Sequence, residues 1–390
     1  MRRAADGLAA WLLVGAIGWA GIAWIGWLLW QSTPSRAGFD LTLLLDAARR
    51  VTAGQSPYDP AMLAGTSPAA TSLFYSYPPP VAQAMTLLAW LPDGVVLVLW
   101  GILATLGLAL TAWRLAIAAG RPAPGADALR AAAVASFLLP FSVAVLFGNL
   151  DAFYPVLYGG LLLAILPGAS RTMQLAGGVA VALATVAKLH PAPLLLWLAV
   201  RAARSRSGAE ARALGAAVVA GLAVVMASLI VGGTGPWLDY VAVVRSAGGA
   251  SFVDPRNAGP VSLIGLVLGL DGPVLVGLQV AVVGGVVVVT LLAGARVRDP
   301  LASFAIVAAA SLVTLPITWY HYLGALIPVA IALAARYPAT RMLLALAGAV
   351  AGLAMAFLPL MWIAVAVLIV VACRQPEGWA KTGRTLPVTP

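Results

Sequence analysis

Long runs of apolar residues, separated by short polar segments, cover most of the 390-residue chain. A helix needs roughly 20 mainly apolar residues to cross the hydrocarbon core of a membrane. The pattern therefore predicts an all-α polytopic membrane protein with about twelve transmembrane helices, within a range of about ten to thirteen. The expected spans lie near residues 8–30, 94–118, 131–147, 152–167, 174–187, 191–200, 213–232, 273–294, 301–316, 322–335, 342–357 and 360–373.

The basic residues set the expected orientation. Cytoplasmic loops carry an excess of Arg and Lys, and threading the chain with its N-terminus inside places most of the 23 basic residues on that side. We therefore expect both termini inside and one membrane domain over residues 1–373, followed by a short, disordered cytoplasmic tail over 374–390. The first run is too long for a signal peptide and lacks a small-residue cleavage site, so a retained helix is expected.

Two apolar runs, 174–187 and 191–200, are shorter than the membrane core is thick. They rise about 21 Å and 15 Å against roughly 30 Å, so the turn between them should stop below the outer surface. That turn contains Lys188 and His190. An ionisable group at membrane depth is a functional hypothesis by default, and a buried cation would suit a lipid phosphate. The alternative is that Lys188 snorkels to the interface and only anchors the turn.

Two long segments on the expected outer side, 31–93 and 233–272, are predicted to roof an active site. In the first, apolar residues at helical spacing predict a helix over 39–53, which Gly54 ends as a C-cap. Residues 81–91 are apolar but too few to span, so they should lie in the membrane interface. Most acidic residues also fall on this side, which indicates either longer outer loops or polar chemistry on that face.

The composition excludes several protein classes. Hydrophobic residues make up 62% and charged residues 9%, whereas soluble domains carry about 25% charged residues. The net charge of +10 does not indicate nucleic acid, because the basic residues form no clustered face. Cys373 is the single cysteine, which excludes an internal disulfide. No Asp-x-Asp pair occurs and the aspartates are dispersed, so neither a metal nor a cofactor is expected.

Six short motifs follow one another along the chain. They are Asp40 with Ala47-Ala48-Arg49, Gly54-Gln55-Ser56-Pro57-Tyr58-Asp59, Tyr77-Pro78-Pro79, Gly148-Asn149-Leu150-Asp151, Lys188-Leu189-His190-Pro191 and Pro316-Ile317-Thr318-Trp319-Tyr320-His321-Tyr322. In this order they resemble the motifs of glycosyltransferase family 87. The chain departs from the family at Gly148-Asn149-Leu150-Asp151, where Gly-Gln-x-Asn is common, and at Tyr322, where a second His is frequent.

This resemblance implies a GT-C type integral membrane glycosyltransferase. The family includes mannosyltransferases that take mannose from a polyprenyl-phosphate donor in cell-envelope glycolipid synthesis. The resemblance therefore implies a GT-C fold in the bacterial inner membrane, with its active site on the periplasmic or extracellular side. The implied partners are the lipid bilayer, the polyprenyl-phosphate sugar and a lipid-linked or glycan acceptor.

Asp40 is the best candidate for the general base. It follows the first expected span by about ten residues, near the outer surface, and inverting glycosyl transfer needs one carboxylate to take the acceptor proton. The alternative is that Asp40 caps the predicted helix. Asp46 faces away and should pair with Arg49 or Arg50. Asp59 is expected to be a turn residue, and a role in the site is the alternative.

Further polar and aromatic residues are candidates for binding the substrates, each with a structural alternative. His321 could belong to an aromatic interface belt, Asn149 and Asp151 could cap a helix, and Arg256 could form a surface ion pair with Asp254. The candidates for the donor phosphate and its sugar are Lys188, His190, His321 and Arg256, with Arg245 beside them. The candidates for the acceptor or sugar are Asn149, Asp151, Tyr58, Asp59, Trp319 and Tyr320.

The preferred reading is a metal-independent, inverting glycosyltransferase with mannose as the first choice of sugar. An arabinofuranosyl or other pentosyl transferase of the same fold is the closest alternative. A lipid or solute transporter comes third, because transporters usually show two related halves with interrupted helices and the short hairpin at Lys188 occurs once.

Overall fold

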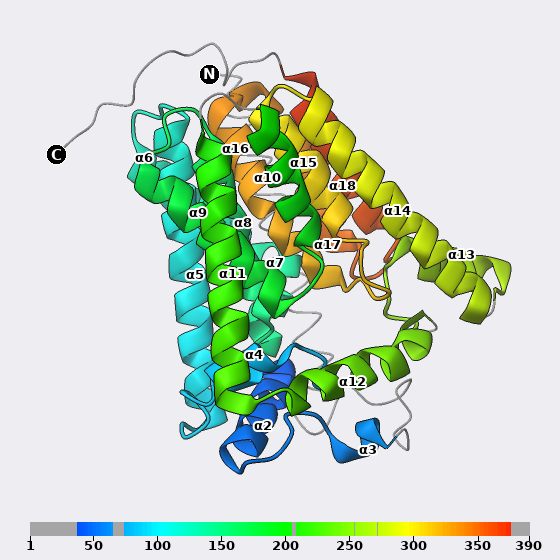
Figure 1. Ribbon diagram of the computed structural model, residues 1–390. Coiled ribbons are helices and arrows are strands. Elements are labelled where there is room, and N and C mark those ends of the chain that lie inside the picture. The colour runs from blue at the N-terminus through cyan, green and yellow to red at the C-terminus, as the bar shows by residue number, and fades with distance from the viewer. Residues whose placement is uncertain (1–36, 65–73, 205–207, 253, 271, 376–390) are drawn as a thin grey trace.

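The computed structural model describes residues 37–64, 74–204, 208–252, 254–270 and 272–375, and every element in this part of the chain is a helix (Figure 1). The all-helical prediction is therefore confirmed for these residues. The first expected span, 8–30, and the expected tail beyond residue 375 lie outside the described residues.

Among the described residues, three helices are long and apolar enough to cross a membrane: α5 (Asp93–Ala118), α11 (Ala209–Gly232) and α14 (Gly272–Arg296). At 1.5 Å per residue each exceeds the hydrocarbon core of roughly 30 Å. Most of the side chains in their apolar windows are not buried in the molecule. Such exposure would be unfavourable in water but suits contact with lipid.

A bent pair of helices could supply a fourth span. Helices α6 (Pro124–Phe137) and α7 (Leu139–Phe147) meet at 72°. Leu138 is extended between them, and Pro140 has no N–H to continue the α6 ladder. The remaining expected spans correspond to shorter apolar helices, so the count of twelve stays a prediction. These are α8 (Tyr154–Ile165), α9 (Arg171–Ala187), α10 (Ala192–Arg204), α15 (Pro300–Ser311), α16 (Ile327–Arg336), α17 (Arg341–Leu353) and α18 (Leu360–Arg374).

Small residues let α9 pack closely between α8 and α11. A Cβ on Gly177 would lie 2.4 Å from the Cβ of Ala164, and one on Gly178 would lie 2.1 Å from the backbone oxygen of Ala213. Close approach at small residues is how helices gain van der Waals contact in lipid, where no hydrophobic force drives them together. The position of α9 fixes the residue that ends it, Lys188.

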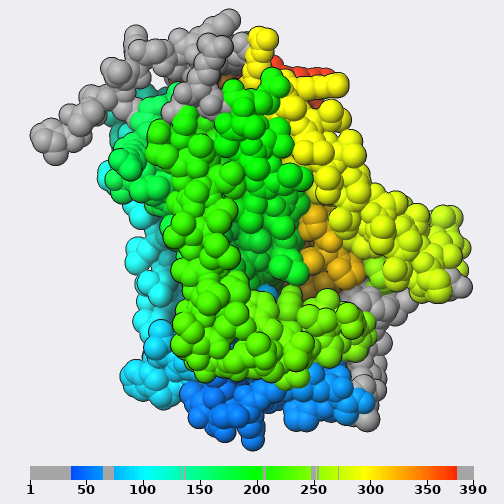
Figure 2. Space-filling model, in the orientation of Figure 1, coloured from blue at the N-terminus to red at the C-terminus, as the bar shows by residue number. Residues whose placement is uncertain are grey.

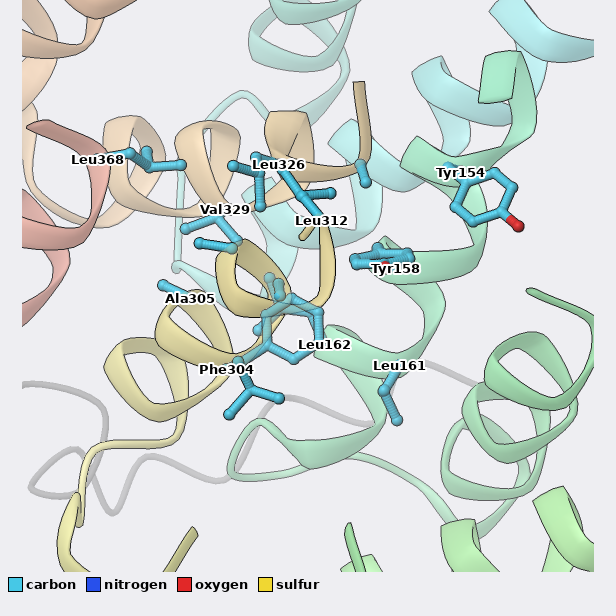
Figure 3. Packing of buried hydrophobic residues seen from close by; sticks show 14 of the residues in the cluster. Tyr154, Tyr158, Leu161, Leu162, Phe304, Ala305, Leu312, Leu326, Val329 and Leu368 are labelled. Atoms are coloured by element: carbon cyan, nitrogen blue, oxygen red, sulfur yellow. The ribbon is translucent and has the colours of Figure 1, made fainter. Parts of the chain in front are cut away.

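The main core surrounds α8. Tyr158 and Leu162 of α8 pack with Phe304 of α15 and Val329 of α16 (Figure 3). The hydroxyl of Tyr158 lies 2.9 Å from that of Ser311, so its polar end is satisfied inside the core.

A layer of helices lies across one end of the molecule, opposite α6 (Figures 1 and 2). It comprises α2 (Phe39–Thr52), α3 (Pro60–Leu63), α4 (Pro79–Met85) and α12 (Gly235–Phe252). The predicted helix over 39–53 is confirmed as α2, and Gly54 follows its C-cap at φ +71°. Residues 81–91 form only the end of α4 and turns, so they do not span. The short α13 (Pro260–Leu268) follows α12 in the chain.

Candidate active site

Two close contacts at glycines hold α2 against the end of α7, and they bring Asp40 next to Asn149. The N–H of Gly38, at φ +73°, donates to the carbonyl of Leu146 (2.8 Å). Gly148 packs so closely on Leu41 that a Cβ there would lie 2.5 Å from the Leu41 Cβ. As a result the Asn149 side-chain amide donates to Asp40 Oδ2 at 2.8 Å.

The interpretation of Asp40 as a helix cap is wrong. Gly38 is the N-cap of α2, and no side chain caps this helix. Asp40 lies in the first turn, where the positive end of the helix dipole favours a carboxylate. Its side chain is half-buried and turns to Asn149 instead of to the backbone amides of its own helix.

Asn149 links Asp40 to the rest of the polar cluster. Its Oδ1 accepts from the backbone N–H of Asp151 (2.9 Å) and from Lys188 Nζ (3.4 Å). Asn149 therefore caps the short η1 helix (Leu150–Phe153), as the structural alternative predicted, and contacts Asp40 with the other end of the same amide. Its carbonyl accepts from Trp100 Nε1 at 3.1 Å.

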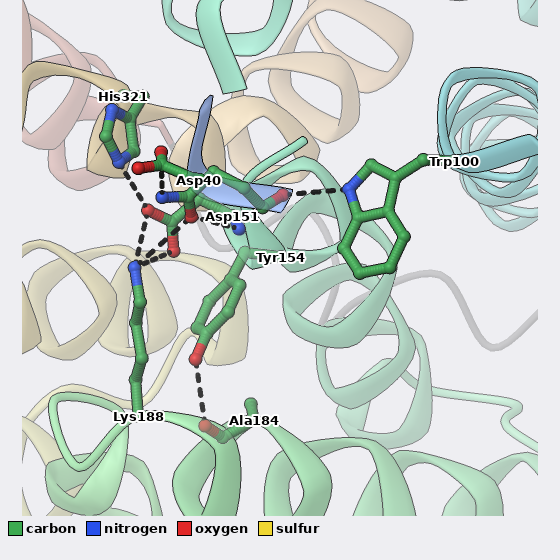
Figure 4. A network of polar contacts seen from close by, with 8 residues as sticks. Asp40, Trp100, Asp151, Tyr154, Ala184, Lys188 and His321 are labelled. Atoms are coloured by element: carbon green, nitrogen blue, oxygen red, sulfur yellow. Dashed lines mark hydrogen bonds and ion pairs between the residues drawn. The ribbon is translucent and has the colours of Figure 1, made fainter. Parts of the chain in front are cut away.

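Asp151 is the buried centre of the cluster (Figure 4). Both of its carboxylate oxygens accept from Lys188 Nζ at 2.8 Å, and His321 Nε2 lies 2.9 Å from Oδ2. The exposed fractions of Asp151 and Lys188 are 1% and 8%. A charge buried this deeply requires a partner. Lys188 therefore does not snorkel: its amine is held inside by the aspartate.

Aromatic rings enclose the cluster. Lys188 Nζ lies 4.5 Å from the ring centroid of Tyr322 and 5.3 Å from that of Tyr77, within the range of cation–π attraction. His190 stacks between Tyr154 and Tyr322, with centroid separations of 5.0 Å on each side. Among the described residues neither ring nitrogen of His190 has a hydrogen-bond partner. His190 thus lies beside the cluster but not in its hydrogen-bond network.

Arg256 is an accessible cation in the loop between α12 and α13. Its side chain is 49% exposed, and it forms an ion pair with Asp254 at 2.6 Å. The surface ion pair expected as an alternative is therefore present. The pKa of Arg256 is raised, first by its hydrogen bonds to Asp254 and, in smaller part, by the negative charge of Asp40. Its guanidinium also lies 5.4 Å from the Trp319 ring centroid, and Trp319 stacks on His321.

Asn257 ties the Arg256 loop to the segment that carries His321. Its Nδ2 donates to the carbonyl of Pro316 (2.8 Å), and its Oδ1 accepts from the backbone N–H of Thr318 (2.9 Å). The same oxygen accepts from the N–H of Gly259 (2.8 Å). Because two distant loops share this one side chain, Arg256 and His321 hold a fixed relation to each other.

Some predicted site residues have structural contacts of their own. The Tyr58 hydroxyl donates to the Tyr77 carbonyl (2.9 Å), and Asp59 caps α3 by accepting from the N–H of Ala61 (2.8 Å). The Tyr320 hydroxyl, from the η2 helix (Tyr320–Leu326), donates to the Ala351 carbonyl (2.6 Å).

Two other charged residues lie apart from the cluster. Arg245 is exposed on α12. Asp46 pairs with Arg49 at 3.0 Å, which confirms the partner predicted for it.

Sequence reasoning missed Trp100 and Asn257 as residues that position the site. Trp100 lies inside an apolar run that reads as an ordinary span, so no local signal marks it. Asn257 stands in a polar outer segment, but nothing in the sequence indicates its contact with residues 316–318. Over the described residues, no three His, Cys, Asp or Glu side chains are grouped as metal ligands; a metal-free reaction stays a prediction.

Comparison with known families adds one match. The sequence model of glycosyltransferase family 87 matches residues 75–316, more than half of the 390 residues. The matched region contains Asn149, Asp151, Lys188 and Arg256, while Asp40 precedes it and residues 317–322 follow it. No curated protein matches the chain.

Proposed function

The chain belongs to glycosyltransferase family 87, and from this premise we propose that it transfers mannose from a polyprenyl phosphate to a lipid-linked or glycan acceptor. Family membership makes the protein a membrane glycosyltransferase, as the six motifs predicted, and the transporter reading is set aside. The proposal adds the sugar, the lipid donor, the outer face of the bacterial inner membrane and the mechanism.

Asp40 is proposed as the general base, and the observation that carries this role is its contrast with Asp151. Asp151 is almost fully buried, and a lysine and a histidine contact its carboxylate. Such a carboxylate is stabilised as an anion and is out of reach of an acceptor. Asp40 is half-buried, and within the described part of the chain its side chain accepts one hydrogen bond, from the neutral Asn149 amide. It therefore keeps lone pairs for an incoming hydroxyl.

The reaction is a single displacement. Asp40 takes the proton of the acceptor hydroxyl while the oxygen of that hydroxyl attacks the anomeric carbon of the donor sugar. The bond between that carbon and the phosphate oxygen breaks, the electron pair leaves with the polyprenyl phosphate, and the configuration inverts. No metal or cofactor takes part in this scheme. Charge therefore develops on the leaving phosphate and must be stabilised by fixed cations.

Arg256 is the cation best placed for the leaving phosphate. It is half-exposed, near enough to Asp40 for the two charges to interact, and a guanidinium can bind a phosphate through two parallel hydrogen bonds. Lys188 and His321 face Asp151 in the structure. Lys188 and His321 would bind the donor phosphate only if they gave up their contacts with Asp151 when the donor binds. His190 would instead support the aromatic rings around them.

The test is labelled transfer with a matched pair of variants. Purified protein in detergent would receive ¹⁴C-labelled polyprenyl-phosphate mannose and a bacterial lipid extract. Asp40→Asn should lower transfer by about 10²–10⁴-fold, the usual contribution of positioned proton transfer. Asp46→Asn, on the same helix but paired with Arg49, should stay near wild type. Equal transfer by wild type and Asp40→Asn would refute the role of Asp40.

A pentosyl transferase of the same fold is the second candidate. It would differ from a mannosyltransferase only in the shape of the sugar pocket, so the transfer assay repeated with each donor decides between the two. Label that moves from polyprenyl-phosphate arabinofuranose, with none moving from the mannosyl donor, would replace mannose in the proposal and leave the mechanism unchanged.

A further inference from the structure

An apolar cavity lies near the end of the molecule opposite α2. It is lined by α5, α6, α16, α17 and α18, and its volume is about 200 Å³. Small side chains keep it open, since a large residue at any of these places would fill it. They include Ala112, Ala116, Ala330, Ala334, Ala347 and Gly348.

The polar part of the cavity carries more positive than negative charge. Arg121, Arg130 and Arg341 line it together with one acid, Asp127. Arg121 binds Asp127 closely (2.7 Å), whereas Arg130 reaches the same carboxylate only at 3.9 Å. Arg341 Nε donates to the backbone carbonyl of Ala334 (2.9 Å). Among the described residues that line the cavity, three cations thus stand against one carboxylate, which leaves two positive charges beside an apolar space.

This combination matches a lipid with a phosphate headgroup. Hydrocarbon would occupy the alanine-lined part, and the phosphate would lie against the arginines, whose planar guanidinium groups suit it. We infer that the cavity is a binding site for an anionic phospholipid of the bilayer. The N-terminal apolar run is a poorer occupant, because Arg2, Arg3 and Asp6 before it sum to a net positive charge, which does not complement the arginines.

The cavity is separate from the candidate active site. Helix α5 runs between the two ends, from Asp93, which pairs with Arg49 of α2, to Ala118 near Arg121. Its 26 residues extend about 39 Å. The cavity nevertheless touches the element that carries His321, since Leu323 and Leu326 of η2 line it. A bound lipid would therefore support η2 from the side away from Asp151.

Native mass spectrometry of the purified full-length protein in detergent tests this site. Phosphatidylglycerol would be titrated against phosphatidylcholine, which has a zwitterionic headgroup. Wild type should retain phosphatidylglycerol preferentially. Arg130→Gln should weaken its binding about fivefold, the usual effect of one basic residue at an anionic lipid surface. Arg114→Gln, an exposed arginine of α5 outside the cavity, should leave binding unchanged.

Two further variants separate the lipid from a general effect of charge. Asp127→Asn should strengthen retention, because the phosphate then no longer competes with a carboxylate for Arg121. Ala330→Leu should weaken retention by filling the apolar part while every arginine remains. The inference would be overturned if both lipids bound equally, or if Arg114→Gln and Arg130→Gln weakened binding to the same extent. It would also be overturned if inorganic phosphate alone competed with the lipid and Ala330→Leu left lipid retention unchanged. Absence of any retained lipid would overturn it as well.

Discussion

Asn149 donates its side-chain amide to Asp40 at 2.8 Å, although 109 positions separate the two residues in sequence. The other end of that amide accepts from Lys188 and from the backbone of Asp151. One neutral side chain therefore connects an accessible carboxylate with a buried, charge-paired one. The orientation of Asp40 depends on the same residue that completes the buried cluster.

Asn149→Ala should lower kcat for sugar transfer more than it changes KM for the donor. The variant removes the hydrogen bond that orients Asp40 but leaves the Arg256 region intact, and positioned proton transfer depends on orientation. A loss of about 10- to 100-fold is expected from steady-state assays with the labelled donor. Asn149→Asp should be at least as impaired, since it sets a like charge beside Asp40. Wild-type kcat in Asn149→Ala would show that the contact has no part in the reaction.

Arg256→Ala should raise KM for the polyprenyl-phosphate donor. Hydrogen bonds to charged groups contribute about 1.5–3 kcal/mol, which corresponds to roughly 10- to 100-fold. Arg256→Lys should lie between wild type and alanine, because it keeps the charge but loses the bidentate geometry. The matched control is Arg245→Ala, an exposed arginine on α12. The role of Arg256 fails if both alanine variants change KM equally.

Lys188→Met should destabilise the protein by about 3–5 kcal/mol, the usual cost of leaving one buried charge without its partner. Adding Asp151→Asn should restore part of this stability, since the double variant buries no unpaired carboxylate. Thermal unfolding in detergent, followed by tryptophan fluorescence, measures both. Losses that simply add in the double variant would mean that the two charges are not energetically coupled.

Gly178→Ala should destabilise the packing of α9 on α11. Its new Cβ would lie 2.1 Å from the Ala213 carbonyl oxygen, so the helices must separate, at a cost of about 1–3 kcal/mol for overpacking. Gly221→Ala on α11 is the control, because its Cβ would meet no atom within 4 Å. The control should be neutral or slightly stabilising in the same melting assay. Equal melting temperatures for the two variants would contradict the close contact.

Local features of the fold could be predicted from the sequence. Apolar spacing fixed the extent and the buried face of α2, and a helix too short to span marked the turn at Lys188. These features depend on neighbours within a few residues. The bend at Leu138 and the shortness of most other helices were not predicted, because hydropathy alone does not register where tertiary packing interrupts a helix.

The candidate site was only partly predictable, because its contacts cross the whole chain. The cost of a buried cation indicated that Lys188 needs a partner, but not that Asp151 supplies it. The interpretation of Asp40 as a helix cap was wrong because Gly38, whose N–H donates to the Leu146 carbonyl, is already the N-cap of the helix. Trp100 and Asn257 act through hydrogen bonds to backbone groups far away in sequence, and no spacing rule detects such contacts.

The close packing of α9 also fixes the position of the buried amine at its end. With Gly177 and Gly178 pressed against both neighbouring helices, α9 has no room to slide, and the amine at its end cannot follow a substrate in or out. The packing of α9, and not a bound substrate, therefore holds the Lys188 amine against Asp151.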